Sequence, residues 1–485
     1  MVTTRKLGTD QPLKLLISFS IPATVGMLVQ AMYNVISRIF IGNSVGTLGI
    51  AGITVAFPAM MIQMAFGFMI GMGATTLVSI RLGQNKKDEA EKIIGTTVLL
   101  LVLVSLLITV FGIHFLEPML RLFGASEQVL PYAKDYLHIV LLGTVVGLMG
   151  FGMNNFIRAE GNPKKAMVTM LMGSVSNIIL SPIFISLLGW GMKGAGIATV
   201  ISQGISASWI LLHFARGKGE LKIRKKYLRI DPKLSTSIMY FGLSPFTMQL
   251  AQSLLNAVMN TNLRTYGGDM AISGMGIVVA LMSLIMMPIM GINTGAQPLI
   301  GYNYGARKFD RVKEFLKYSI IAATVIAVVG FIFIRMFPTQ LIAIFSSKDQ
   351  ELIDFGSKAL VNFLIFLPIV GFQIVGAGYF QAIGKPVTAM ILSLSRQLLV
   401  FIPMLLILPK FLGLNGVIAS GPVADLVSTI ITGIWLAFAL QDLNRKIQSN
   451  MNIGSKGTKG TEDDKKPEKG ALPKIINEKQ LVPER

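Results

Sequence analysis

The chain has 485 residues, of which 52% are apolar and only 14% are charged, whereas a soluble protein carries about 25% charged residues. So few charged side chains cannot cover the surface of a water-soluble protein of this length. The formal net charge is +20, and the absence of cysteine excludes disulfides and thiolate chemistry. The three histidines, His114, His138 and His213, are scattered and show no metal-ligand spacing.

Apolar segments recur along the whole chain and are long enough for membrane-spanning helices, which need about 20 residues each. Residues 93–113, for example, contain no charged side chain. Continuous rather than alternating apolar runs indicate helices instead of a β-barrel. The sequence therefore predicts an all-α integral membrane protein with twelve transmembrane helices, at 13–41, 47–80, 93–116, 130–157, 165–188, 194–214, 234–263, 270–302, 314–336, 353–380, 386–408 and 414–440.

Charged segments lie outside these predicted helices. Lys and Arg concentrate before the first helix and after the even-numbered helices up to the tenth, most densely in the linker 215–233. By the positive-inside rule, both termini are predicted to lie in the cytoplasm and the protein in the inner (plasma) membrane. The basic linker is then explained by contact with anionic membrane lipid, so no nucleic-acid partner is expected. Residues 443–485, rich in Lys, Glu, Gly and Pro, are predicted to be a disordered cytoplasmic tail.

The two halves of the chain repeat each other. The stretch "RAEGNPKKAM" at 158–167 returns as "QAIGKPVTAM" at 381–390, and "MGAT" at 72–75 returns as "TGAQ" at 294–297, with shifts of 222 or 223 residues. Because each half has an even number of helices, both halves enter the membrane in the same direction. The sequence predicts an N-terminal bundle and a C-terminal bundle, at 1–214 and 234–442, related by a pseudo-twofold axis along the membrane normal.

Such a duplication leaves a central cleft between two similar bundles. Rocking the bundles can expose the cleft to either side of the membrane in turn, which favours a solute transporter. A receptor or scaffold would leave the duplication unexplained. A membrane-embedded enzyme is not expected, because the predicted helices carry no His/Glu metal motif, no Gly-x-Ser-x-Gly and no acidic cluster at membrane depth. No catalytic residue and no metal site are therefore assigned.

Several longer stretches resemble a known family. They include "IPATVGMLVQAMYNVISRIFIG" at 21–42, "QPLIGYNYGARKFDRVKE" at 297–314, "LSRQLLVFIP" at 394–403 and "GPVADLVS" at 421–428. Together they resemble the bacterial branch of the MATE (multidrug and toxic compound extrusion) family, over about residues 10–442. The resemblance implies a secondary antiporter that exports organic, often cationic, small molecules in exchange for H⁺ or Na⁺. No nucleotide-binding loop is visible, and no cofactor other than the coupling cation is expected.

The chain departs from the family pattern at two positions. The first-helix pattern commonly carries an acid where this chain has Ser37, and the fifth-helix pattern commonly carries one where "NIILSP" places Ser181. Serine can form hydrogen bonds but cannot carry a titratable charge at these positions. A coupling scheme that needs a carboxylate in the N-terminal half is therefore not supported by the sequence.

Two ionisable residues are predicted to lie deep in the membrane, Arg396 in the eleventh helix and Asp425 in the twelfth. At about 1.5 Å of rise per residue, they lie about 18 Å and 16 Å from the outer ends of these helices. Both depths are near the middle of the bilayer, so the two groups can meet. They either form a fixed ion pair between two helices, or Asp425 faces the cleft and exchanges H⁺, Na⁺ or a cationic substrate for Arg396. A charge at this depth favours the functional interpretation.

Uncharged polar side chains form a second group of candidates. Buried amides need hydrogen-bond partners, and each could simply bind a neighbouring helix. Their density in helices one, two, seven and eight nevertheless predicts a polar cleft. The candidate cleft residues are Gln30, Asn34, Ser37, Gln63, Asn154, Asn177, Ser181, Gln252, Asn256, Asn293 and Gln397.

Prolines mark possible hinges in equivalent helices. Pro22 and Pro245 are predicted to interrupt the hydrogen bonding of the first and seventh helices, because proline within a helix produces a kink. Bending at Pro22 is a hypothesis for opening and closing the cleft. The alternative function within transport is a flippase for lipid-linked sugars or other amphipathic lipids. A flippase for pyrophosphate-linked cargo should have a strongly basic cleft, whereas Arg396 is the only deep base predicted here.

Overall fold

The structure, a computed structural model, describes residues 4–216, 219–344 and 350–457. Within these ranges the chain is helical apart from short connections, and no strand occurs. The first half contains α1 (Thr4–Leu7), α2 (Pro12–Ser44), α3 (Thr47–Gly83), α4 (Lys87–His114), α5 (Leu116–Leu122), α6 (Leu130–Leu142), α7 (Thr144–Ala159), α8 (Pro163–Pro182), the π-helix η1 (Ile183–Leu187) and α9 (Gly191–Ala215).

The second half repeats this order of long helices. It contains η2 (Lys225–Tyr227), α10 (Pro232–Phe241), α11 (Leu243–Gly305), α12 (Phe309–Met336), α13 (Pro338–Ala343), α14 (Gln350–Phe363), α15 (Leu367–Ala382), α16 (Pro386–Leu394), the π-helix η3 (Ser395–Phe401), α17 (Ile402–Leu412) and α18 (Leu414–Gly457).

The helices account for the twelve predicted crossings. Among the described residues, nine helices are long and apolar enough to cross a membrane, and the bent pairs α6–α7 (59°) and α14–α15 (51°) raise the number to eleven. The remaining crossing is the seventh, formed by α10 and residues 243–267, where Gln249, Gln252 and Asn256 reduce the apolar character. It is separated from the eighth at Gly268, which has φ 64° and ψ −161° inside α11.

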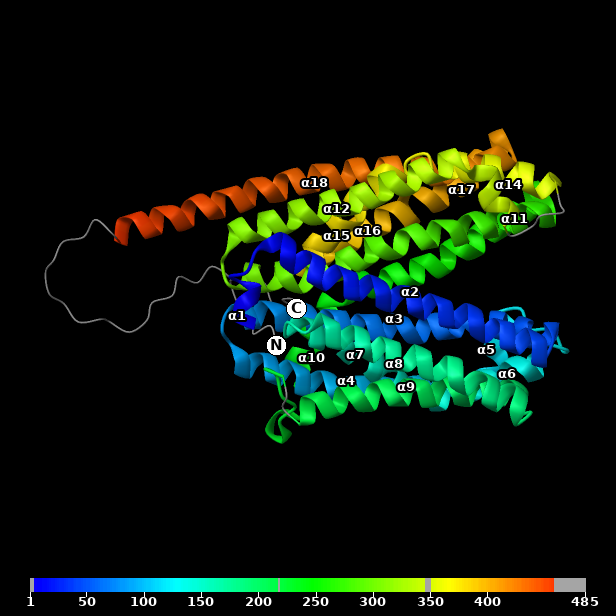
Figure 1. Cartoon of the computed structure of the whole chain (residues 1–485), viewed down its shortest axis with the longest axis horizontal. Coiled ribbons are helices and arrows are strands. Elements are labelled where there is room, and N and C mark those ends of the chain that lie inside the picture. The colour runs from blue at the N-terminus through cyan, green and yellow to red at the C-terminus, as the bar shows by residue number, and fades with distance from the viewer. Residues whose placement is uncertain (1–3, 217–218, 345–349, 458–485) are drawn as a thin grey trace, which may run out of the picture.

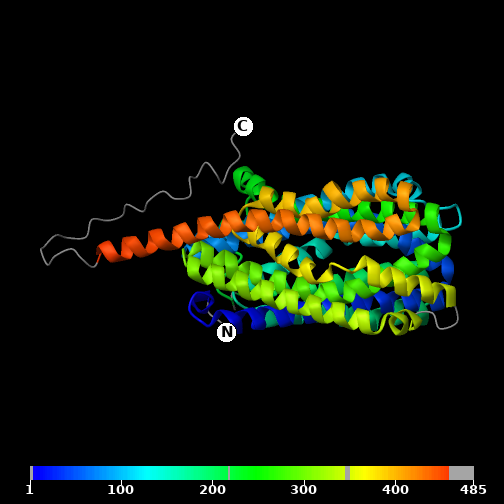
Figure 2. The same ribbon diagram turned by 90° about the horizontal axis from the view of Figure 1, so that it is seen from above.

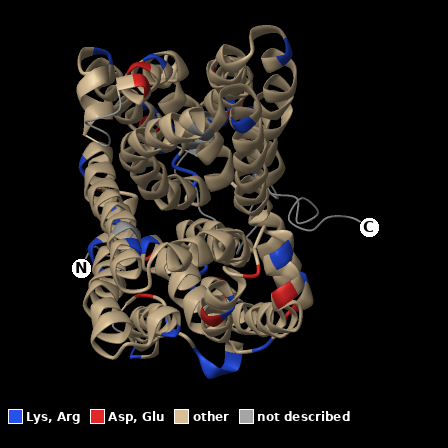
Figure 3. Ribbon diagram, turned by 90° about the vertical axis from the view of Figure 1, so that its right-hand side faces the viewer, with Lys and Arg blue, Asp and Glu red and all other residues tan. Residues whose placement is uncertain are grey.

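Two bundles lie side by side with their helices along the long axis of the molecule (Figure 1). In this view the first half forms the lower bundle and the second half the upper one, except for α10, which packs against α3 and α4 in the lower bundle. The axes of the two bundles diverge toward the right-hand end. Figure 3 shows that Lys, Arg, Asp and Glu are sparse along the helices. We call the left-hand end of Figure 1 the basic end, because the Lys- and Arg-rich segments 81–92, 216–233 and 306–317 belong to it.

At the basic end, the first part of the seventh crossing packs against the first half, and the first part of the first crossing packs against the second half. A Cβ built on Gly73 of α3 would lie 2.1 Å from the carbonyl oxygen of Ile238, at the start of the seventh crossing. A Cβ on Gly295 of α11 would lie 2.9 Å from the backbone of Ser20, in the first crossing. Gly73 and Gly295 are 222 residues apart, so the same close approach occurs twice. Neither position has room for a side chain.

The twelfth crossing is longer than predicted. Helix α18 continues to Gly457 and extends beyond the other helices at the basic end (Figures 1 and 2). The prediction of disorder is therefore wrong for 443–457, and residues 458–485 lie outside the described residues. The helix continues because Leu443 and Ile447, one turn apart, are buried in the core that includes Val312 and Leu316 of α12.

The two predicted hinge prolines lie in different settings. Pro22 is inside the continuous helix α2. Pro245 instead lies in the first turn of α11, because the seventh crossing is already interrupted at Gly242 between α10 and α11. Proline is tolerated in the first turn, where its missing N–H would have no helical partner. The prediction that Pro245 interrupts a helix is thus wrong, and a hinge role for Pro22 stays a prediction.

Candidate functional site

The deep ion pair predicted from the sequence is present. Nε of Arg396 lies 2.6 Å from Oδ1 of Asp425. The Asp425 side chain is 5% exposed and the Arg396 side chain 18% exposed. The pair joins η3 to α18, so the prediction that the two groups meet is confirmed. Its role in ion coupling stays a prediction.

Local helix geometry brings Arg396 and Gln397 into place. Both residues lie in the π-helix η3, which ends just before Pro403. Wider π-helical turns often occur at functional sites. Nε2 of Gln397 donates to Oε1 of Gln252 on α11 at 2.9 Å. Thus η3 holds α18 through Arg396 and α11 through Gln397.

The hydrogen bonding continues from Gln397 toward the surface. Nε2 of Gln252 donates to Oδ1 of Asn256 at 3.3 Å, and Asn256 is exposed. Oε1 of Gln397 is buried and has no hydrogen-bond partner within the described residues. We call Gln252, Asn256, Arg396, Gln397 and Asp425 the C-half polar site. It combines a neutral ion pair with a hydrogen-bonded series of amides that reaches the surface of α11, and the two parts are adjacent in η3 through Arg396 and Gln397.

The N-terminal half contains a polar cluster without charge. Oγ of Ser181 donates to Oδ1 of Asn177 at 3.0 Å, and both side chains are buried.

Gln203 stands 222 residues before Asp425, and this shift also relates Gly194 to Gly416. Cβ atoms on these two glycines would each lie 2.4 Å from a carbonyl oxygen, of Phe184 or of Leu408. An amide therefore occupies the place of the carboxylate in this half.

The other predicted cleft residues do not form one site. Gln63 is buried on α3, and Asn293 lies against Gly378 of α15. Gln30 and Ser37 are partly buried on α2, and Gln30 has an interaction partner. The side chain of Asn34 lies outside the described residues.

Asn154 leads to a residue that the sequence analysis missed. Its Nδ2 donates to the carbonyl oxygen of Ala166 at 3.1 Å, and its Oδ1 accepts from Nη2 of Arg158 at 3.4 Å. Arg158 is only 7% exposed, in the last turn of α7. In the sequence, Arg158 falls just beyond the fourth predicted helix, 130–157. The repeat carried a signal, because Arg158 stands where the second half has the neutral Gln381.

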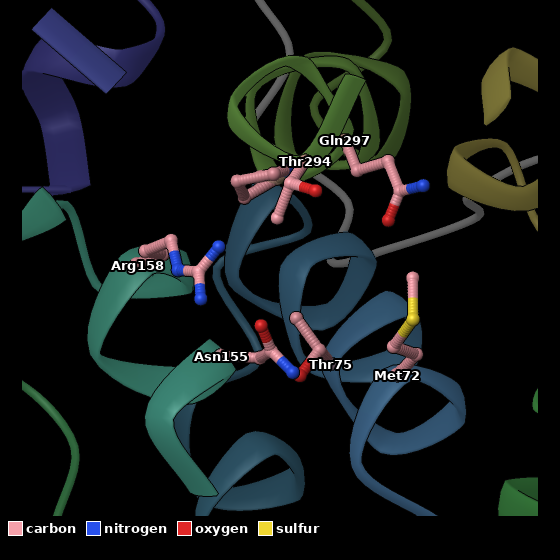
Figure 4. Close-up of a pocket in the computed structure, with 7 residues that line it drawn as sticks. Met72, Thr75, Asn155, Arg158, Thr294 and Gln297 are labelled. Carbon is pink, nitrogen blue, oxygen red and sulfur yellow. The ribbon is translucent and has the colours of Figure 1, made fainter. Parts of the chain in front are cut away.

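Arg158 lines a small pocket between the bundles. The pocket has about 260 Å³ of empty space, its mouth included, and is lined by Met72 and Thr75 of α3, Asn155 and Arg158 of α7, and Thr294, Gln297 and Pro298 of α11. Figure 4 shows the guanidinium pointing into the space between Asn155 and Thr294. The pocket therefore exists only where the two halves approach each other.

Two ion pairs attach the basic linker to the first bundle at the basic end. Nε of Arg224 lies 2.5 Å from Oε2 of the buried Glu91, and Nζ of Lys92 lies 2.7 Å from Oδ2 of Asp231. The hydrogen bond from Lys92 holds the pKa of Asp231 below its usual value, and the backbone N–H of Leu234 adds to this effect. These contacts orient the linker along α4.

Metal binding is not indicated by the described residues. No group of three or more His, Asp or Glu side chains among them is arranged to hold a metal ion. The polar side chains of both halves instead provide amide, hydroxyl and guanidinium groups, with Asp425 as the carboxylate of the C-half polar site.

Sequence comparison and structure comparison match this chain to the same group of proteins. The MatE family model matches twice, at residues 22–183 and 246–407. Multidrug export protein MepA of Staphylococcus haemolyticus is 29% identical over 429 residues, covering 88% of this chain and 94% of the relative. MepA of Staphylococcus aureus (strain MSSA476) is 27% identical with the same coverage.

Solved structures have the same fold. A multidrug resistance MATE family transporter of the MOP superfamily in an outward-facing conformation gives a TM-score of 0.85 at 26% identity, covering 90% of this chain and 98% of that one. A MATE structure in the bent conformation gives 0.86 at 26% identity, covering 91% and 98%.

Proposed function

The chain belongs to the MATE family of membrane transporters, and on that premise we propose that it is a secondary active antiporter. It exports organic, often cationic, compounds in exchange for H⁺ or Na⁺. Its similarity to the multidrug export proteins MepA supports a multidrug substrate range. The distribution of Lys and Arg supports placement in the plasma membrane with the basic end, and both termini, in the cytoplasm.

One observation carries the proposal: a buried carboxylate, Asp425, is paired with a single base. The pair is neutral as a unit, and Asp425 can accept one further cation only if Arg396 leaves it. H⁺, Na⁺ and a cationic substrate therefore compete for the same carboxylate, which is the requirement for exchange. Removing one partner of a buried ion pair is strongly unfavourable, so each occupant favours a different arrangement of η3 and α18.

The packing between the bundles supports alternating access. The close glycine contacts at Gly73 and Gly295 close the basic end, whereas the bundle axes diverge toward the other end (Figure 1). Asn256 is exposed and belongs to the part of α11 that precedes Gly268, residues 243–267. The proposal therefore assigns access from the outer side to the C-half polar site in this arrangement. The opposite state requires the glycine contacts to separate.

Transport by the full chain in lipid vesicles tests the proposal. Efflux of a fluorescent organic cation is measured with a Na⁺ gradient alone and with a pH gradient alone. At least one gradient is expected to drive efflux by the natural protein. Asp425→Asn is expected to abolish efflux, because the amide cannot hold H⁺ or Na⁺ in exchange for Arg396.

The matched control is Asp442→Asn, on the same helix. Asp442 is half exposed and pairs with Lys446 one turn away, so its replacement is expected to leave efflux unchanged. Gel filtration in detergent checks that both variants fold. Gradient-driven efflux by a folded Asp425→Asn protein, or the absence of a response to either gradient in the natural protein, would overturn the proposal.

A further inference from the structure

Among the described residues, no Asp or Glu forms an ion pair with the guanidinium of Arg158. Its Nε and Nη1 atoms are buried and have no hydrogen-bond partner among the described residues, and Nη2 has only the 3.4 Å contact with Asn154. Nε carries one N–H and Nη1 carries two, so three donors of a charged group remain unused. A buried charge without partners is strongly unfavourable.

The nearest acid in sequence does not supply the missing charge. Glu160 is fully buried and is bonded to His213, and its Oε2 accepts from the backbone N–H of Leu221 in the linker. No Asp or Glu is among the described residues that line the pocket. The carboxylate that Arg396 has in Asp425 has no equivalent at Arg158.

The other pocket residues provide neutral polar groups. Asn155, Thr294 and Gln297 line the pocket, and the described residues contain no hydrogen bond from these side chains. Amide and hydroxyl groups can donate to an oxygen atom. With Arg158 they offer donors from both bundles to one small, negatively charged ligand.

We propose that this pocket binds a small oxyanion, a phosphate or carboxylate group, between Arg158 of the first bundle and Thr294 and Gln297 of the second. The guanidinium is suited to such groups because it presents several N–H donors in one plane. The phosphate comes either from the cytoplasmic solution or from a lipid headgroup at the membrane surface. The enclosed part of the pocket, about 10 Å³, holds about one water-sized group, so one oxygen of the anion lies inside it and the rest of the group lies toward the mouth.

The site has a consequence for conformational change, which rests on the proposed alternating access. The ligand contacts both bundles only while the basic end is closed. A ligand that binds one of two states shifts the protein toward that state. At about ten times its dissociation constant, the anion should reduce the population of the open state about tenfold.

The first test measures thermal unfolding of the full chain in detergent without phosphate or sulfate. Inorganic phosphate is added in increasing amounts to the natural protein, to Arg158→Gln and to Arg229→Gln. Gln is a suitable replacement because it occupies the equivalent position, Gln381, in the second half. Arg229, in the linker, bonds a backbone carbonyl and controls for loss of one positive charge at the same end.

The expected result is a concentration-dependent rise in unfolding temperature for the natural protein and Arg229→Gln, and its loss in Arg158→Gln. A parallel series in nanodiscs compares phosphatidylcholine with phosphatidylglycerol, without added phosphate. A rise with inorganic phosphate identifies a free anion, and a rise only with phosphatidylglycerol identifies a lipid headgroup. No rise in any series would mean that the pocket holds water only, and an equal rise in Arg158→Gln would place the anion elsewhere; either result overturns the proposal.

The second test measures closure directly. The chain has no cysteine, so Ser79→Cys introduces a single thiol. Ser79 is buried on α3 against Gly301 of α11, and labelling with a maleimide requires the basic end to open. Phosphate at about ten times its dissociation constant should slow labelling about tenfold, and Arg158→Gln should remove this effect. Anion binding without an effect on labelling would retain the site but remove its link to alternating access, whereas loss of efflux with anion binding intact would affect only the proposed function.

Discussion

Arg396, which is partly buried, and Arg158, which is buried, differ in how their positive charges are compensated. Arg396 lies against the carboxylate of Asp425 at 2.6 Å, whereas Arg158 has one 3.4 Å contact with an amide. The first pair is neutral and is completed within one bundle. The second arginine lies where the two bundles meet, and two of its guanidinium nitrogens have no hydrogen-bond partner among the described residues. In the functions proposed above, the first site exchanges its cation and the second site recruits an anion.

Removing the charge of Arg396 should have the largest effect on stability. Arg396→Gln leaves Asp425 buried without its base, and breaking a buried pair in this way costs about 3–5 kcal/mol. The double variant Arg396→Gln/Asp425→Asn removes both charges and should recover most of this loss. Thermal or denaturant unfolding in detergent measures both changes.

The comparison with Arg158 provides the control. Without added anion, Arg158→Gln removes a charge that has no internal partner, so it should leave stability unchanged or increase it. Equal destabilisation by Arg158→Gln and Arg396→Gln would show that the two arginines do not differ as described. A double variant as unstable as Arg396→Gln alone would also contradict the comparison.

A substitution that disturbs the packing at the basic end should have an intermediate effect on stability. Gly73→Ala places a methyl group 2.1 Å from the carbonyl oxygen of Ile238, and overpacking of this kind typically costs about 1–3 kcal/mol. The closed state should be destabilised, so maleimide labelling of Ser79→Cys should become faster and phosphate less effective.

Gly204→Ala is the matched control for this substitution. Gly204 lies on α9, and its Cβ would have no neighbour within 4 Å. Labelling should therefore be unchanged. If both alanine variants label at the same rate, the glycine contacts do not control closure of the basic end.

The partly exposed ion pair between Lys92 of α4 and Asp231 of the linker should have the smallest effect on stability. Lys92 lowers the pKa of Asp231 in the folded protein, so this interaction stabilises the fold above the unfolded-state pKa and is lost as pH falls through the lower folded-state value. Both side chains are partly exposed, which limits the contribution to less than about 1 kcal/mol. Unfolding measured from pH 7 to pH 3 should show a slightly weaker pH dependence in Lys92→Gln. An unchanged pH profile would remove this contribution.

The sequence predicted the features that depend on how deep a residue lies in the membrane or on the pattern of apolar residues along a helix. The positions of Arg396 and Asp425 along consecutive antiparallel helices were sufficient to predict their contact. The long apolar segments likewise predicted the crossings other than the seventh. The seventh was predicted at 234–263, although α10 and residues 243–267 are not among the helices that are long and apolar enough to cross a membrane. These features depend on the length and direction of each helix and hardly on how the bundles pack.

Features that depend on contact between distant segments could not be predicted. Arg158 is buried because α11 closes over the end of α7, and nothing in residues 158–167 requires that closure. The interruption before Pro245 reflects close packing of Gly242, whose Cβ would lie 1.7 Å from the carbonyl oxygen of Met69. Leu443 and Ile447 extend α18 because they join the core formed with α12. In each case the decisive neighbour is more than a hundred residues away.

Cation-dependent binding of substrate tests the central claim most directly. Affinity of the purified full chain for a fluorescent organic cation is measured across pH and Na⁺ concentration, for the natural protein and for Asp425→Asn. If Asp425 exchanges its cation, affinity in the natural protein falls as H⁺ or Na⁺ increases, and the dependence disappears in the variant. The same dependence on H⁺ or Na⁺ in both proteins would contradict the account.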